Sequence, residues 1–260
     1  MDHHVDERDL WLRCFVPAPD SPTRLICFPH AGGSASAYHT LSVALAPTAE
    51  VFAVQYPGRQ DRRNEPCIDN VPELLDRLVP LLSTPGDERP LALFGHSMGA
   101  TLAYEVARRL QELGGAAEPV IVFLSGRRAP HFERGETVHL RDDQGILREL
   151  ELLGGSVGAA LRDPEILQMV MPAIRGDYRA AETYVHVPGP PLRSPVVALT
   201  GDRDPRASVG EVEGWRRYTE GPFSQHVFEG GHFYLNDQAE AVQETVRRHL
   251  SALPVPGVGA

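Results

Sequence analysis

Three side chains of the types that hydrolyse acyl bonds occur along this chain in the order serine, acid, histidine. Ser97 stands at the centre of Gly95-His96-Ser97-Met98-Gly99, and Asp204 and His232 follow it. Hydrolysis by a serine requires a base for the hydroxyl proton, a carboxylate that orients this base and donors for the developing oxyanion. These residue types therefore predict acyl transfer to Ser97, with His232 as the base and Asp204 as the acid.

The residues around Ser97 predict a nucleophile elbow, which is a sharp turn between a strand and a helix. A short apolar segment, Leu91–Phe94, precedes the turn, and an amphipathic pattern from Met98 to Leu113 follows it. Glycines at positions 95 and 99 remove side chains that would clash in so tight a turn. The five-residue pattern alone also occurs in glycine-rich turns with an incidental serine, so the flanking strand and helix carry the prediction.

The acid and the base each follow a predicted strand. Asp204 comes after Pro195–Thr200, and His232 comes after Ser224–Glu229. Ligands of open α/β sheets bind at the carboxyl ends of the strands, so Ser97, Asp204 and His232 are expected at one edge of the sheet. Their order is the one found in α/β-hydrolases, and it differs from the orders in chymotrypsin and subtilisin.

Other residues could take the same two roles. Asp202 is a second candidate for the acid, and Asp204 is preferred because it lies further into the loop. His30 and His96 are alternative bases. Because His96 adjoins Ser97 in sequence, its side chain is expected to diverge from that of the serine and to pack or hydrogen-bond locally.

The oxyanion hole of this fold uses the backbone N–H after the nucleophile and a second N–H from the loop after an early strand. The first would be that of Met98. The second is expected in Pro29-His30-Ala31-Gly32-Gly33, where the Ala31 N–H is the predicted donor. The alternative is a glycine turn that serves only to reverse the chain.

Short apolar segments alternate with amphipathic ones over most of the chain. The expected strands are Leu10–Val16, Thr23–Phe28, Val51–Tyr56, Leu91–Phe94, Val120–Ser125, Pro195–Thr200 and Ser224–Glu229. The expected helices span about residues 36–46, 71–82, 98–113, 208–218 and 238–253. Continuous apolar strands between amphipathic helices indicate a parallel sheet covered on both faces. The predicted fold class is therefore α/β, an α/β-hydrolase with a mostly parallel central sheet and helices on both faces.

The alternation stops between residues 127 and 191, where helical patterns occur without a convincing strand. One helix is expected from Asp142 to Leu153, followed by Gly154-Gly155, and another after Asp163-Pro164, with Pro172 and Gly176 expected to bend or break it. We expect residues 127–191 to form a helical lid inserted in a core made of residues 1–126 and 192–260. The alternative is a surface elaboration with no role in substrate access.

Composition excludes several other classes of protein. The net charge of -10 argues against nucleic acid as a partner. The chain shows neither a secretory signal nor eighteen consecutive apolar residues, so a cytoplasmic protein without membrane contact is expected. Its three cysteines are widely spaced and form no C-x-x-C pair, so neither a structural disulfide nor a metal site is expected.

Several longer motifs resemble those of the type II thioesterases, the stand-alone editing hydrolases of polyketide and nonribosomal peptide assembly lines. Besides the elbow, the matching stretches are Phe28-Pro29-His30-Ala31-Gly32-Gly33, Gln55-Tyr56-Pro57-Gly58-Arg59, Leu150 to Gly155, Met171-Pro172-Ala173-Ile174-Arg175-Gly176-Asp177-Tyr178 and Gly230-Gly231-His232-Phe233. The resemblance extends from about Leu10 to Leu250. One departure is Gly176, where this family is expected to have a bulkier residue such as alanine.

The resemblance implies a substrate, a partner and a role for each site residue. Such enzymes remove acyl groups from the phosphopantetheine thiol of acyl or peptidyl carrier proteins, clearing stalled or wrongly primed units. It implies that Ser97 attacks the thioester, His232 acts as base and then acid, and Asp204 orients His232. The Ala31 and Met98 N–H groups would hold the oxyanion. No cofactor is expected beyond the phosphopantetheine of the substrate, and the protein is expected to be a monomer.

Carrier proteins are usually acidic, as this chain is, so docking would need local positive charge. A basic patch drawn from a set of five arginines is one hypothesis, and ordinary surface ion pairs are the alternative. The five are Arg59, Arg62, Arg63, Arg127 and Arg128. Two other functions remain open at this stage: a general carboxylesterase or lipase on the same fold, and a hydrolase-fold binding protein without turnover.

Overall fold

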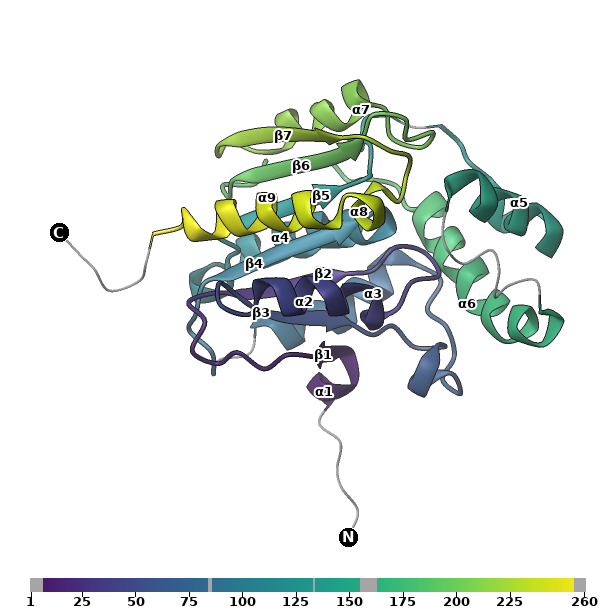
Figure 1. The fold of residues 1–260 in the computed structure, drawn as a ribbon, viewed down its shortest axis with the longest axis horizontal. Coiled ribbons are helices and arrows are strands. Elements are labelled where there is room, and N and C mark those ends of the chain that lie inside the picture. The colour runs from purple at the N-terminus through teal and green to yellow at the C-terminus, as the bar shows by residue number, and fades with distance from the viewer. Residues whose placement is uncertain (1–6, 84–85, 133, 155–162, 255–260) are drawn as a thin grey trace, which may run out of the picture.

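The computed structural model describes residues 7–83, 86–132, 134–154 and 163–254. Within these ranges a seven-stranded sheet has the strand order β1-β3-β2-β4-β5-β6-β7 (Figure 1). The strands are β1 Leu12–Cys14, β2 Arg24–Phe28, β3 Glu50–Val54, β4 Leu91–His96, β5 Ile121–Ser125, β6 Val196–Gly201 and β7 Phe223–Phe228. Only β1 runs antiparallel to its neighbour, and all other pairs in this sheet are parallel. The predicted fold class is therefore confirmed.

Helices of very different length connect the strands. The α-helices are α1 Glu7–Trp11, α2 His39–Leu45, α3 Val71–Ser83, α4 Met98–Leu113, α5 Asp143–Leu153, α6 Pro164–Thr183, α7 Val209–Glu213, α8 Tyr234–Asp237 and α9 Ala239–Ser251. The short 3₁₀ helices are η1 Ala35–Tyr38, η2 Gln60–Arg62, η3 Gly115–Ala117, η4 Val138–Leu140 and η7 Gly214–Tyr218. No helix within the described ranges is both long and apolar enough to cross a membrane.

Each face of the sheet is covered by its own apolar core. Ile26 and Phe28 of β2 belong to a cluster that includes α3 and α4, whereas Leu25 and Cys27 belong to a second cluster that includes α2 and α9. Successive side chains of a strand point to opposite faces, so a strand that is buried on both faces must be apolar at every position. This is why these strands appear in the sequence as continuous apolar runs.

Some predicted boundaries differ from the structure. The strand expected over Leu10–Val16 is reduced to Leu12–Cys14, because Glu7–Trp11 forms a helical turn and only three residues pair with β3. The acidic Glu7 and Asp9 in that first turn suit a helix N-terminus. The helices expected near residues 36–46 and 208–218 are each divided into an α-helical and a 3₁₀ part.

Between β5 and β6 the described residues contain helices and no strand, as predicted. We call helices α5 and α6 together the α5–α6 segment, and Figure 1 shows both helices at one end of the sheet, beside the layers formed by the rest of the chain. Asp142 caps α5, and Gly154 ends it with φ 76°, as predicted for the C-terminal glycine, while Gly155 lies outside the described residues. The division of the whole chain into a core and a lid stays a prediction.

The expected break in α6 is wrong, because the helix runs through both Pro172 and Gly176. Pro172 lies on the exposed side of α6, where water can bind the carbonyl group that loses its intrahelical partner. A Cβ atom at Gly176 would make only ordinary contacts, 3.5 Å from the Cβ of Cys67. Met171 and Ile174 of α6 join Ile146 and Leu150 of α5 in a small apolar cluster.

Candidate active site

Ser97 occupies a strained turn between β4 and α4. Its backbone has φ 56° and ψ −117°, a conformation that L-residues rarely adopt outside special turns. A Cβ atom at Gly95 would lie 2.0 Å from the Gly99 carbonyl oxygen, and one at Gly99 would lie 1.9 Å from the Phe28 carbonyl oxygen. Both positions therefore require glycine, and the turn has the geometry of a nucleophile elbow.

His232 and Asp204 come together from the loops after β7 and β6. The Nδ1 atom of His232 lies 2.8 Å from Oδ2 of Asp204, and the Arg206 N–H donates to Oδ1 at 2.8 Å. Because a carboxylate accepts at Nδ1, that nitrogen carries the hydrogen and Nε2 is left as a base. His232 and Ser97 line the same cavity. No hydrogen bond joins the Ser97 hydroxyl to the ring in the described part of the chain, as is common before substrate binds.

The alternative acid has a different environment. Asp202 accepts the Gly230 N–H at 2.8 Å and lies 3.8 Å from the Arg203 side chain. Its partly exposed carboxylate thus holds the turn before His232, whereas that of Asp204 contacts the imidazole. The geometry therefore favours Asp204, the acid predicted from its position in the loop.

The two alternative bases are held as neutral rings. Burial, together with the charge of His232, lowers the pKa of His96 well below its usual value, and its Nδ1 lies 2.9 Å from the Ser125 hydroxyl. Burial and the same neighbour lower the pKa of His30 to about 4. Neither ring forms a hydrogen bond with a described carboxylate, so among the imidazoles of this cavity His232 is the one that a carboxylate orients.

The two predicted oxyanion donors lie on the same cavity. Ala31 and Met98 line it with Ser97, and Met98 is the first residue of α4, where a helix presents unpaired N–H groups and a positive dipole. The neighbouring Gly32 N–H donates to Asp177 and the Gly33 N–H donates to the His30 carbonyl oxygen. Among the described residues neither the Ala31 nor the Met98 N–H has an acceptor, so both remain available to a ligand.

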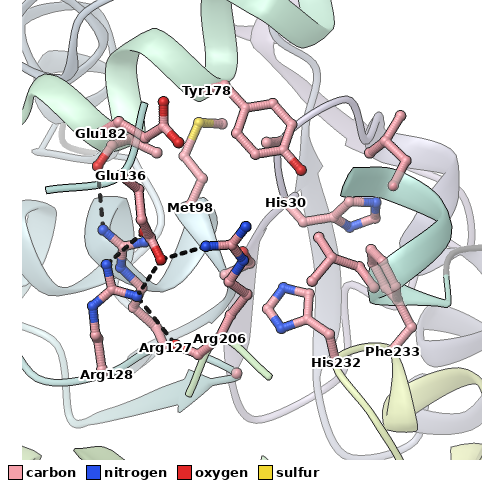
Figure 2. Close-up of a pocket in the computed structure, with 16 residues that line it drawn as sticks. His30, Met98, Arg127, Arg128, Glu136, Tyr178, Glu182, Arg206, His232 and Phe233 are labelled. Atoms are coloured by element: carbon pink, nitrogen blue, oxygen red, sulfur yellow. Dashed lines mark hydrogen bonds and ion pairs between the residues drawn. The ribbon is translucent and has the colours of Figure 1, made fainter. Parts of the chain in front are cut away.

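The cavity is bounded by the elbow, the loops after β6 and β7, and the α5–α6 segment. Figure 2 shows His30, His232 and Phe233 on one side, three arginines on the other, and Tyr178 of α6 at the top of the view. The arginines are Arg127, Arg128 and Arg206. Burial, followed by the charge of Arg128, lowers the pKa of Arg127 to about 10. The wall opposite the histidines is therefore polar and carries glutamates, Glu136 and Glu182, as well as arginines.

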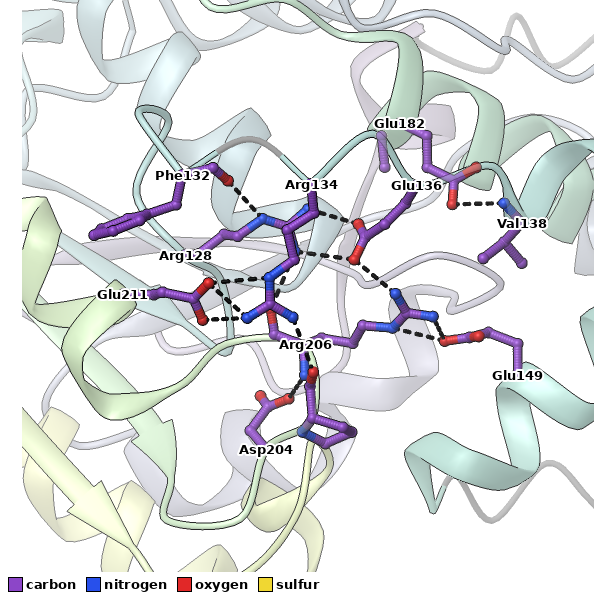
Figure 3. Close-up of polar contacts among 12 residues, drawn as sticks. Arg128, Phe132, Arg134, Glu136, Val138, Glu149, Glu182, Asp204, Arg206 and Glu211 are labelled. Carbon is purple, nitrogen blue, oxygen red and sulfur yellow. Dashed lines mark hydrogen bonds and ion pairs between the residues drawn. The ribbon is translucent and has the colours of Figure 1, made fainter.

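A partly buried ion-pair network forms this polar wall (Figure 3). The Arg206 side chain pairs with Glu136 at 2.6 Å, and its Nε donates to Glu149 of α5 at 2.7 Å. Arg128 pairs with the same Glu136 at 2.6 Å. Since the backbone N–H of Arg206 also donates to Asp204, the network connects α5 to the loop that carries the predicted acid.

The structure contradicts the hypothesis of a basic docking patch. Arg59 and Arg128 are buried and paired with Asp177 and Glu136, and Arg62 is buried against Trp11 and paired with Glu65. Arg127 lines the cavity, which leaves Arg63 as the exposed member of the set. These arginines were expected at the surface because a charge in sequence does not reveal its partner. In the fold Arg59 and Arg128 belong to internal ion pairs, and Arg62 is itself buried.

Two buried carboxylates without a predicted role, Asp177 and Glu149, contact loops of the site. The position of each carboxylate on its helix is a signal that the sequence contains. Glu149 lies between Ile146 and Leu150 on the buried face of α5, and Asp177 follows Ile174 on that of α6. An acidic residue on an apolar helix face requires a buried partner.

Comparisons with known proteins agree on one family. A model of the Thioesterase domain matches residues 23–250. The protein Thioesterase PikA5 of Streptomyces venezuelae is 49% identical over 241 residues, which make up 93% of this chain and 85% of that protein. The solved structure of the type II thioesterase BorB, from the borrelidin biosynthetic cluster, has a TM-score of 0.86 and 48% identity, covering 93% of this chain and 98% of BorB. RedJ, a thioesterase from the prodiginine pathway in Streptomyces coelicolor, has a TM-score of 0.80 and 36% identity, with coverages of 91% and 90%.

Proposed function

From the premise that this chain belongs to the thioesterase family of α/β-hydrolases, we propose that it hydrolyses acyl thioesters carried on the phosphopantetheine arm of carrier proteins. The chain is a thioester hydrolase of the type II class by its relatives. The borrelidin and prodiginine pathways named for two of them support an assembly line as the source of its substrate. Its role there would be to remove stalled or wrongly primed acyl groups.

The observation that carries the proposal is the contact between His232 Nδ1 and Asp204 at 2.8 Å, at a cavity that Ser97 also lines. Nε2 of His232 takes the proton from the Ser97 hydroxyl as its oxygen attacks the thioester carbon. The carbonyl oxygen gains negative charge and accepts hydrogen bonds from the N–H groups of Ala31 and Met98. The carbon–sulfur bond then breaks, and the proton on His232 passes to the departing thiol.

In the second half of the reaction, water hydrolyses the acyl-enzyme with the help of the same protein groups. His232 takes a proton from a water molecule, which attacks the acyl ester on Ser97 and forms a second oxyanion at the same two N–H groups. Collapse of this intermediate returns a proton to Ser97 and releases the free acid. Each proton, nucleophile and leaving group in this scheme is supplied by the protein, the thioester or water, so the proposal includes no cofactor beyond the phosphopantetheine of the substrate.

Mass spectrometry of the protein mixed with an acyl-carrier protein tests this function. We expect release of the free acid and a transient acyl adduct on Ser97, both abolished in Ser97→Ala. The matched control is Ser251→Ala at the exposed end of α9, which should retain the wild-type rate. The corresponding oxygen ester should turn over more slowly than the thioester. If no acyl-carrier protein yields either an adduct or a free acid, the proposed function is wrong.

A further inference from the structure

A buried carboxylate of α6 contacts the loop that carries the predicted oxyanion donor. Asp177 is 1% exposed, and its Oδ2 accepts the Gly32 N–H at 2.7 Å across 145 positions of sequence. The two segments are also packed together, because a Cβ atom at Gly32 would lie 3.1 Å from the Ile174 side chain. The carboxylate therefore reaches the backbone one residue beyond Ala31.

Arg59, in the loop after β3, holds this carboxylate from the other side. Its two terminal nitrogens lie 2.6 Å and 2.8 Å from the two oxygens of Asp177, and one of them also donates to the Gly33 carbonyl oxygen at 3.0 Å. Such a two-pronged pair fixes the carboxylate in orientation as well as position. Asp177 and Arg59 together thus bind the backbone on both sides of the Gly32–Gly33 peptide.

The residues before Arg59 hold other parts of the same loop. The Tyr56 hydroxyl donates to the Pro29 carbonyl oxygen at 3.2 Å, and the Ala35 N–H donates to the Gln55 side chain at 3.0 Å. The loop is therefore tied to the β3 end at Pro29, Gly33 and Ala35.

The Ala31 N–H lies in the middle of this fixed loop. It shares a peptide plane with the His30 carbonyl group, which accepts the Gly33 N–H at 2.9 Å. The Gly32 N–H is bound to Asp177, whereas the Ala31 N–H has no acceptor among the described residues and Ala31 lines the cavity with Ser97.

We propose that Asp177 is the positioning residue of the oxyanion hole: by holding the Gly32 N–H away from the cavity, and with Arg59 beside it, Asp177 aims the Ala31 N–H at the oxyanion. The inference rests on the proposed acyl hydrolysis at Ser97. Without the carboxylate the Gly32–Gly33 turn can rotate, and the Ala31 N–H then points away from the developing charge. Because Asp177 belongs to α6, the position of this helix determines the direction of the Ala31 N–H in the oxyanion hole.

The test is steady-state hydrolysis of a p-nitrophenyl ester, together with the affinity for a trifluoromethyl ketone that adds to Ser97 as a transition-state analogue. Asp177→Asn keeps the shape of the side chain but loses its charge. We expect kcat to fall about 10- to 100-fold, because a donor aimed away from the oxyanion forfeits much of its contribution. KM should change less than about twofold, since the hole binds the transition state more strongly than the substrate. Affinity for the ketone should fall in parallel with kcat.

Two further variants separate positioning from folding. Arg179→Ala is the matched control, because Arg179 lies two residues further along α6 and links it to Asp69 through an exposed ion pair at 2.7 Å. This variant should keep the wild-type kcat and ketone affinity. Arg59→Lys keeps the positive charge but cannot bind both carboxylate oxygens and the Gly33 carbonyl group, so a smaller fall in kcat, about 5-fold, is expected.

The inference is overturned if a folded Asp177→Asn or Arg59→Lys protein retains the wild-type kcat and ketone affinity. It is also overturned if only KM changes. The ester and the ketone probe the oxyanion hole of any serine acyl hydrolase, so these outcomes do not depend on the carrier-protein substrate. Failure of the proposed function would instead appear as a wild-type protein that is inactive on acyl-carrier proteins.

Discussion

The sheet and the α5–α6 segment are held in place by different kinds of contact. The strands lie between two large apolar clusters, and an ion pair on the adjoining helices, that of Arg109 with Asp76, is largely exposed. The α5–α6 segment has a small apolar cluster of its own, and its buried carboxylates, Glu149 and Asp177, contact arginines of the loops around Ser97. Apolar packing depends little on direction, whereas these ion pairs fix orientation.

The residues at the strand ends and the two helices beside the cavity are therefore held by different contacts. The sheet brings Ser97 and His232 together through the positions of the strand ends. The two helices then contact the neighbouring loops: Asp177 holds the loop of Ala31, and Glu149 holds Arg206, whose N–H group donates to Asp204. A change in the sheet should therefore unfold the whole protein, while a change in the helical anchors should act locally.

The largest effect is expected from a change in the elbow. In Gly99→Ala the new Cβ would meet the Phe28 carbonyl oxygen at 1.9 Å, and neither backbone can move without breaking the sheet. We expect a loss of about 5 kcal/mol or more in the free energy of unfolding, which is comparable to the stability of a whole domain. Circular dichroism and urea denaturation measure this. Gly210→Ala in α7, where a Cβ would meet nothing within 4 Å, should fold normally; equal behaviour of the two variants would contradict the steric argument.

The second effect tests the anchoring of α5. Glu149→Ala removes a carboxylate that is buried against Arg206, and breaking such a pair should cost about 3 kcal/mol. Because the loss is confined to the helical anchor, hydrogen exchange should accelerate in α5 while the amides of β4 and β5 remain protected. Glu151→Ala, on the exposed side of the same helix, is the control. Uniform acceleration over the sheet in Glu149→Ala would show that the two regions are not separable.

The third effect concerns pH and the loop between the two regions. The pKa of His30 is lowered from 6.5 to about 4, chiefly by burial, so between these values the unfolded chain binds a proton that the folded protein does not. The contribution of His30 to the free energy of unfolding should be fully present above pH 6.5. It should fall as the pH drops towards 4, by up to about 3 kcal/mol. Urea denaturation at pH 7.5 and 5 measures the loss. A His30→Asn variant should lose less stability between these pH values, and an equal loss would contradict the assignment.

The smallest effect is expected on the exposed surface of the core. Arg109→Ala removes the ion pair with Asp76, whose partners are 37% and 69% exposed. The expected loss is below about 1 kcal/mol, and it should vanish in 1 M salt, because water and ions already screen this pair. Urea denaturation at two salt concentrations checks it. A loss as large as that of Glu149→Ala would remove the distinction between exposed and buried ion pairs.

The sheet, its parallel strands and the elbow could be predicted because each depends on short stretches of sequence. Continuous apolar strands, amphipathic helices and the glycines around Ser97 are patterns of a few residues with direct steric or hydrophobic causes. The first strand and the course of α6 were predicted less well. Their outcome depends on packing: β1 is limited by three pairs with β3, and Pro172 is tolerated because it faces water.

The candidate site also has features that the sequence reveals and features that depend on the fold. The types and order of Ser97, Asp204 and His232 are visible in the sequence, because the chain order of this fold and the position of strand ends are local features. The partners of the charged residues are not, since Arg59 meets Asp177 across 118 positions and Gly32 meets it across 145. A charge attracts any opposite charge within reach, and only the folded chain determines which one that is.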